Sequence, residues 1–61
     1  MITRTYYIKN SSFLNQTLKI IKKNVPCFIE REFIEMDMSK VTIKCRWEDI
    51  EYIIAKLAPL F

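Results

Sequence analysis

The segment SSFLNQTLKIIKKNVP, residues 11–26, decides the fold because it separates one strand-like segment from two others. On a helical wheel its apolar side chains form one broad stripe and its polar side chains form the opposite face, which predicts an amphipathic helix. The preceding serines are candidate N-caps, and Pro26 cannot continue a helix. Asn24 is a candidate left-handed cap. The stripe consists of Phe13, Leu14, Thr17, Leu18, Ile20, Ile21 and Val25.

Before this helix, the segment ITRTYYIK at residues 2–9 is rich in β-branched and aromatic residues and is typical of a strand. Side chains alternate between the two faces of a strand. One face would therefore carry Ile2, Tyr6 and Ile8, with Arg4 near the end, and the other would carry Thr5, Tyr7 and Lys9.

After the helix, CFIEREFIEMD at 27–37 and VTIKCRW at 41–47 read as two strands, with DMSK at 37–40 as the turn between them. The apolar parity of the first of these strands switches between Phe33 and Ile34, which indicates either a β-bulge or a strand with apolar side chains on both faces. The second alternates regularly. Its inward residues would be Val41, Ile43, Cys45 and Trp47, and its outward residues Thr42, Lys44 and Arg46.

The last segment, EDIEYIIAKLAPLF at 48–61, predicts a second helix on the stripe Ile50, Ile53, Ile54 and Leu57. Pro59 disfavours helical geometry at the residue before it, so the helix should end near Ala58. Leu60 and Phe61 then form a short apolar tail. Three outcomes remain open for this tail: it completes the core, it hooks another chain, or it frays.

The order β-α-β-β-α over a single domain, 1–61, predicts a small two-layer α+β sandwich with a three-stranded antiparallel or mixed sheet. The first strand should pair with the third, and both helices should cover one sheet face. This arrangement resembles the ferredoxin-like fold without its last strand. The resemblance is one of topology and carries no functional motif.

Composition argues against catalysis. The chain has no His, which is the commonest general base and metal ligand, and no Gly for a phosphate-binding loop. The acids Glu30, Glu32 and Glu35 are typical of a solvated strand face paired with bases across a hairpin. We therefore expect no enzyme activity, no metal, no cofactor and no small-molecule substrate.

The two cysteines, Cys27 and Cys45, are too isolated for a zinc site. With the turn centred at Met38–Ser39, Cys45 would lie opposite about residue 32, so both are expected to be small core residues rather than a disulfide. No apolar run approaches a membrane span, and the first residues do not resemble a signal peptide. A reducing, cytoplasmic location is expected.

Charge and topology together indicate a binding protein. Residues 1–26 hold five bases and no acid, whereas residues 27–61 hold five bases and seven acids. One interpretation is that the two oppositely charged halves attract each other within one domain. The other is that the basic half forms a surface for an acidic partner. The first strand would also leave one edge unpaired. We expect a protein partner or a homodimer to bind at this edge and on the uncovered sheet face, as an accessory or regulatory subunit or an inhibitor does, through Thr5, Tyr7, Lys9, Leu60 and Phe61.

The alternative function is binding of RNA or single-stranded DNA. Aromatic and basic side chains on an open sheet face, together with lysines on the first helix, would supply stacking and phosphate contacts. This alternative set consists of Tyr7, Lys9, Lys19, Lys22, Lys23, Lys44 and Arg46.

Overall fold

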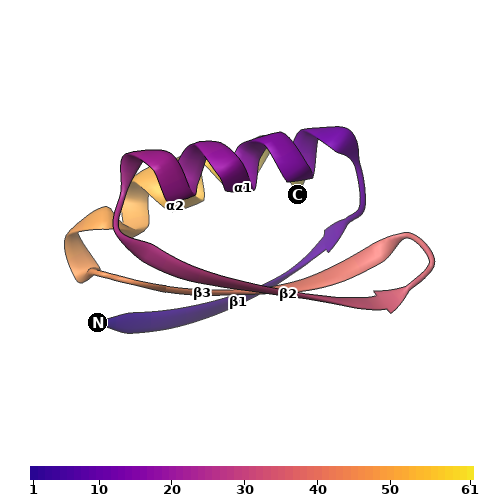
Figure 1. Ribbon diagram of the computed structural model, residues 1–61, viewed down its shortest axis with the longest axis horizontal. Coiled ribbons are helices and arrows are strands. Elements are labelled where there is room, and N and C mark those ends of the chain that lie inside the picture. The colour runs from indigo at the N-terminus through magenta and orange to yellow at the C-terminus, as the bar shows by residue number, and fades with distance from the viewer.

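A computed structural model describes all residues, 1–61, as a three-stranded sheet with two helices packed on one side (Figure 1). The strands are β1 (Ile2–Lys9), β2 (Cys27–Glu35) and β3 (Met38–Cys45), and the helices are α1 (Ser12–Asn24) and α2 (Ile50–Leu57). Short 3₁₀ turns, η1 (Trp47–Asp49) and η2 (Ala58–Leu60), flank α2. The small α+β class that the sequence predicts is confirmed.

The sheet has the order β1-β3-β2, and both neighbouring pairs are antiparallel. β3 is the central strand, and its inward side chains Val41, Ile43 and Cys45 are completely buried. Ile8 from β1 joins them, and the helices close the core with Leu14, Leu18, Ile21, Ile53 and Leu57. The core is thus one layer of aliphatic side chains, with Cys45 among them, between the sheet and the helices.

At the N-terminus of helix α1, a side chain accepts a hydrogen bond from a backbone N–H that has no acceptor within the helix. The Leu14 N–H donates to Ser11 Oγ at 3.1 Å, so Ser11 is the N-cap. The helix ends at Asn24, its C-cap Val25 is extended at φ −135°, and no residue has a positive φ. The predicted left-handed cap at Asn24 is therefore wrong. The proline at 26 favours extended geometry at Val25 and ends the helix without such a cap.

Removing this cap tests the local account of α1. We expect Ser11→Ala to lower the free energy of unfolding by about 1 kcal/mol, because the Leu14 N–H loses its acceptor. Ser12→Ala is the matched control, since Ser12 is the first residue within the helix and gives no cap bond. Urea denaturation monitored by circular dichroism measures both. Equal losses in the two variants would contradict the capping role of Ser11.

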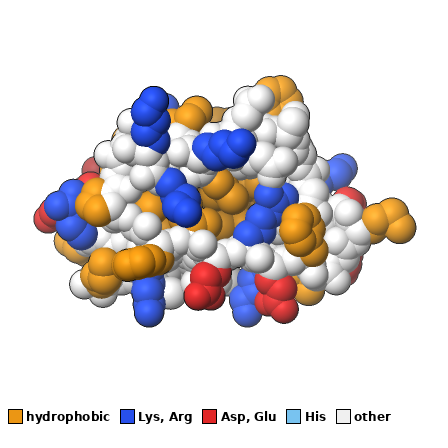
Figure 2. Space-filling model, in the orientation of Figure 1, with side chains coloured by type: hydrophobic (Ala, Val, Ile, Leu, Met, Phe, Trp, Pro, Cys, Tyr) orange, Lys and Arg blue, Asp and Glu red, His pale blue; other side chains and the backbone are white.

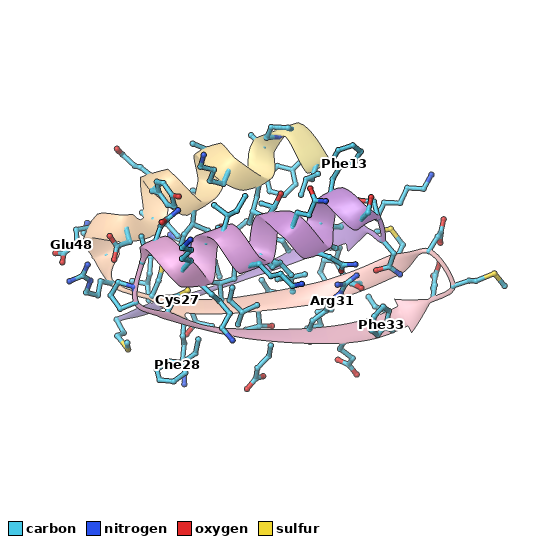
Figure 3. The ribbon with its side chains drawn as sticks, turned by 45° about the horizontal axis from the view of Figure 1, so that its top comes forward. Phe13, Cys27, Phe28, Arg31, Phe33 and Glu48 are labelled. Atoms are coloured by element: carbon cyan, nitrogen blue, oxygen red, sulfur yellow. The ribbon has the colours of Figure 1, made fainter.

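The buried stripes of both helices are narrower than the sequence predicts. Phe13 is 68% exposed, and Ile20 and Ile54 are also exposed, so these three apolar side chains lie outside the buried core. Phe33 of β2 is exposed as well, beside the hairpin turn (Figure 3).

The hairpin turn lies at Met36–Asp37 and not at 37–40 as predicted, so β3 begins at Met38. The bulge, one of the two predicted alternatives, is confirmed, because the register shifts between Phe33 and Glu35. The new register corrects the position of the cysteines: Cys45 lies opposite Cys27, not residue 32. The shifted turn and the bulge together change every partner of β3 on β2, whereas alternation along β3 keeps Val41, Ile43 and Cys45 on their predicted face.

The end of β3 also differs from the prediction. The strand ends at Cys45, and Trp47 begins η1 with 66% of its surface exposed, so Trp47 is not a core residue. Arg46 leaves the sheet and is not an outward strand residue. Its Nε donates to Asp49 Oδ2 at 2.8 Å, and Glu48 lies at 3.3 Å. Helix α2 ends at Leu57 with Ala58 as its C-cap, as Pro59 predicts.

A polar cluster joins β2, β3 and α1 at the hairpin end of the domain. Arg31 donates from Nε to Ser39 Oγ at 3.1 Å, from one terminal nitrogen to Asn10 Oδ1 at 2.9 Å, and from the other to Asn15 Oδ1. The buried hydroxyl of Ser39 donates to Asn10. The Arg31 guanidinium also lies 4.7 Å from the centroid of the Phe33 ring. Because no acid pairs with Arg31, neutral oxygens hold this cation.

Candidate interaction surface

The outer edge of β1 is a long, regular strand edge with no neighbour. β1 pairs with β3 along all eight residues and with no other strand. The N–H of Asn10 donates to the carbonyl of Asp37 at 2.7 Å, which continues the β1–β3 register by one residue. Hydrogen-bonded and non-hydrogen-bonded pairs alternate along an antiparallel ladder. The even-numbered residues of β1 therefore bond to β3.

The same alternation defines what β1 presents outward. The backbone N–H and C=O groups of Thr3, Thr5, Tyr7 and Lys9 point away from β3. We call these residues the β1 edge. The strand has no proline and no bulge, so nothing in its backbone prevents another strand from pairing there. Its charged side chains, Arg4 and Lys9, are both basic.

The opposite edge of the sheet is built differently. β2 pairs regularly with β3 from Cys27 to Phe33 and then carries a bulge at Ile34, so its regular edge is shorter than that of β1. The β1 edge is thus regular over its whole length, whereas the β2 edge is interrupted near the hairpin turn. This difference makes β1 the better candidate for strand addition.

The sheet face away from the helices has no covering layer; we call it the open face (Figure 1). The register arranges it in four rows: Thr3–Lys44–Phe28, Thr5–Thr42–Glu30, Tyr7–Lys40–Glu32 and Lys9–Met38–Glu35. Lysines thus lie on β1 and β3, and glutamates lie on β2. In Figure 2 basic and acidic side chains lie together along the lower side of the molecule, where this face is seen edge-on.

Two aromatic side chains stand on the open face. Tyr7 is 61% exposed and Phe28 is 67% exposed, and Figure 3 shows Phe28 pointing away from the helices. Phe28, Glu30, Thr42 and Lys44 line a shallow hollow between β2 and β3. Lys40, beside Tyr7, escaped the sequence prediction because residues 37–40 were assigned to the turn. Only the observed register reveals it.

The apolar tail lies against the domain on the helix side. Leu60 is half-buried against the core, and the Phe61 ring stacks on Tyr6 with centroids 5.6 Å apart. Burial raises the pKa of the Tyr6 hydroxyl, and Arg4 partly opposes that rise. Phe61 itself remains 66% exposed. The predicted residues Thr5, Tyr7, Lys9 and Phe61 therefore all lie on or beside β1. Leu60 instead packs against the core.

The alternative nucleic-acid residues are not brought together. Lys19, Lys22 and Lys23 lie on α1, in the layer opposite the open face that carries Tyr7, Lys9 and Lys44. Arg46 is engaged by Asp49 and Glu48, and its hydrogen bond to Asp49 raises the pKa of its guanidinium. Three glutamates share the open face with its lysines. A phosphate backbone would meet both signs of charge there.

The chain contains no group of three His, Cys, Asp or Glu side chains close enough to hold a metal ion. No helix is both long enough and apolar enough to cross a bilayer. No protein-family model matches the chain. Searches of curated proteins and of solved structures likewise return no significant match.

Proposed function

We propose that this chain is a non-catalytic interaction module, an accessory or regulatory subunit or an inhibitor, that binds an extended segment of a partner protein at the β1 edge. The observation that carries the proposal is the regular, unpaired edge of β1, with its outward backbone groups at Thr3, Thr5, Tyr7 and Lys9. Strand addition supplies main-chain hydrogen bonds for affinity, and side chains on either face supply specificity.

The charge of β1 indicates which kind of partner segment would bind at its edge. The β1 strand carries Arg4 and Lys9 and no acid, and residues 1–26 contain no acid at all. An acidic strand therefore complements the edge. A second copy of this chain is the other occupant, but its own β1 edge is equally basic. Tyr7 on the open face and Phe61 on the helix side flank the edge and offer apolar contact area on both faces.

We further propose that the fold is the ferredoxin-like sandwich without its last strand. The observed element order and the sheet order β1-β3-β2 support this. In the complete form of that fold, a fourth strand would pair with β1. The segment bound at the β1 edge would then occupy the place of that strand.

A proline at Thr5 tests the edge directly. Thr5→Pro removes an outward N–H and leaves the ladder to β3 intact, so the variant should fold, since proline is tolerated on edge strands with a solvent-facing N–H. We expect its recovery of bound protein from native lysate to fall at least about tenfold. Thr5→Ala is the matched control, because it changes the same side chain and retains the N–H.

The lysate is divided into portions with and without nuclease, and each variant is checked for folding by circular dichroism and for mass by sedimentation. Protein capture that persists in a folded Thr5→Pro variant would refute edge binding. Recovery of nucleic acid, with affinity that falls steeply as salt is raised, would instead support the alternative function. Self-association lost only in Thr5→Pro would identify a second copy as the occupant.

A further inference from the structure

The two cysteines lie directly opposite each other at the end of the sheet farthest from the hairpin turn. Cys27 opens β2 and Cys45 closes β3, and the register pairs them. Both are free thiols; Cys45 is completely buried and Cys27 is half-buried. Figure 3 places Cys27 where the chain enters β2, below the end of α1.

The hydrogen-bonding pattern fixes the kind of pair that they form. Because Asn10 bonds to Asp37, the odd-numbered residues of β3 are the ones whose backbone groups bond to β1. The backbone groups of Cys45 therefore point toward β1. Cys27 and Cys45 are therefore a non-hydrogen-bonded pair of the β2–β3 ladder. In such pairs the Cα atoms are about 4.5 Å apart, with side chains close together on one face. Disulfides span Cα separations of about 4.4–6.8 Å.

We propose that Cys27 and Cys45 are a modification site, a dithiol that a low-molecular-weight disulfide such as oxidised glutathione converts reversibly to an intramolecular disulfide. The site is separate from the β1 edge and does not depend on the function proposed above.

The reaction proceeds by two exchange steps. The Cys27 thiolate attacks one sulfur of oxidised glutathione, which forms a mixed disulfide and releases one glutathione thiolate. The Cys45 thiolate then attacks the Cys27 sulfur and releases the second. Two electrons pass from the cysteine pair to glutathione, and the two thiol protons end on the two reduced glutathione molecules. Cys27 reacts first because Cys45 is sealed from solvent.

Burial and neighbouring charges change the pKa values of the two thiols and therefore the rate of this reaction. Burial raises the pKa of both thiols; Lys22 opposes the rise at Cys27, and the N-terminus and Arg4 oppose it at Cys45. Asp49 raises both, and Cys45 further raises that of Cys27. The thiolate fraction is therefore small at neutral pH. Since the thiolate is the nucleophile, the rate of oxidation should increase as the pH rises toward these pKa values.

The disulfide would join β2 to β3 at the open end of their hairpin. The turn at Met36–Asp37 already joins them at the other end. A bond between Cys27 and Cys45 therefore closes the hairpin into a ring and restricts the unfolded chain. The oxidised form should be the more stable one, with a Tm higher on the order of 10 °C.

The test incubates the reduced full chain with mixtures of reduced and oxidised glutathione and measures intact mass, thiol count and Tm. We expect the wild type to lose both thiols, to form no covalent dimer and retain no glutathione, and to return to its original Tm with dithiothreitol. Cys45→Ser should accumulate one glutathione on Cys27, because no second thiol resolves the mixed disulfide. Cys27→Ser should remain unmodified, because Cys45 is buried.

Three results would overturn the proposal: a wild-type chain that retains both thiols, one that stops at the mixed disulfide, or one that forms covalent dimers. A disulfide form with a lower Tm would contradict the inferred geometry. If Cys45→Ser does not fold, the wild-type mass and thiol count decide the question alone.

Discussion

Replacing Ile43 by alanine is expected to leave most of the chain unfolded at 25 °C. Ile43 is completely buried at the centre of β3, with Arg4 and Ile29 as its cross-strand neighbours. Removing a buried isoleucine side chain to the β-carbon costs about 2–5 kcal/mol through lost transfer free energy and the cavity left behind. A single core of this size supplies roughly 3–5 kcal/mol in all. The loss is therefore comparable to the whole stability.

The matched control is Ile54→Ala, which removes the same atoms from α2. Ile54 is 42% exposed, so its removal should cost much less, and alanine has the higher helix propensity. Far-ultraviolet circular dichroism and urea titration of the two variants measure the difference. If Ile43→Ala remains folded with a stability equal to that of Ile54→Ala, the core lies elsewhere than between β3 and the helices.

Local patterns predicted the elements of this fold, because each depends on residues close in sequence. The separation of apolar and polar side chains between Ser12 and Val25 was enough for α1. Pro59 was enough to end α2, and the parity switch after Phe33 indicated the bulge as one of two alternatives. These signals act within a few residues, so no tertiary contact was needed to interpret them.

The cross-strand partners could not be predicted in the same way. Met36–Asp37 and Met38–Ser39 were comparable turn candidates by composition, and no glycine marked the choice. The turn at Met36–Asp37 requires no positive φ. The two-residue error kept each side chain of β3 on its predicted face, and so the buried residues Val41 and Ile43 were predicted correctly. It misplaced Lys40 and concealed the pairing of the cysteines.

The residues of the candidate site likewise divide into those that local sequence patterns predict and those that only the tertiary structure places. Thr5, Tyr7 and Lys9 follow from strand alternation and from the prediction that the first strand has an unpaired edge, and the structure places all three along the β1 edge. Phe61 was also in the predicted set, but its place beside β1 could not be predicted, because its stacking partner Tyr6 is far away in sequence. Lys19, Lys22 and Lys23 were grouped with Tyr7 by charge alone, and only the layer order separates them.

No local sequence pattern singled out Arg31, whose contacts in the structure give the second large effect. We expect Arg31→Met to lower the free energy of unfolding by about 2–4 kcal/mol, because Asn10, Asn15 and Ser39 lose the donors that hold β2, β3 and α1 together. The Ser39 hydroxyl would stay buried beside an apolar side chain. Urea denaturation of the purified variant measures the loss.

The Arg31→Lys variant distinguishes the effect of the directed guanidinium hydrogen bonds from the effect of the positive charge. The Arg31 guanidinium donates in three directions to three neutral oxygens and lies over the Phe33 ring, and the chain's two salt bridges both belong to Arg46. A lysine keeps the charge but lacks the planar fork. We therefore expect Arg31→Lys to lose at least half as much stability as Arg31→Met, by an amount that salt changes little, because no ion pair is screened. Near-complete rescue by lysine, or a loss that shrinks steeply with salt, would show that the cluster holds a charge and not a set of directed hydrogen bonds.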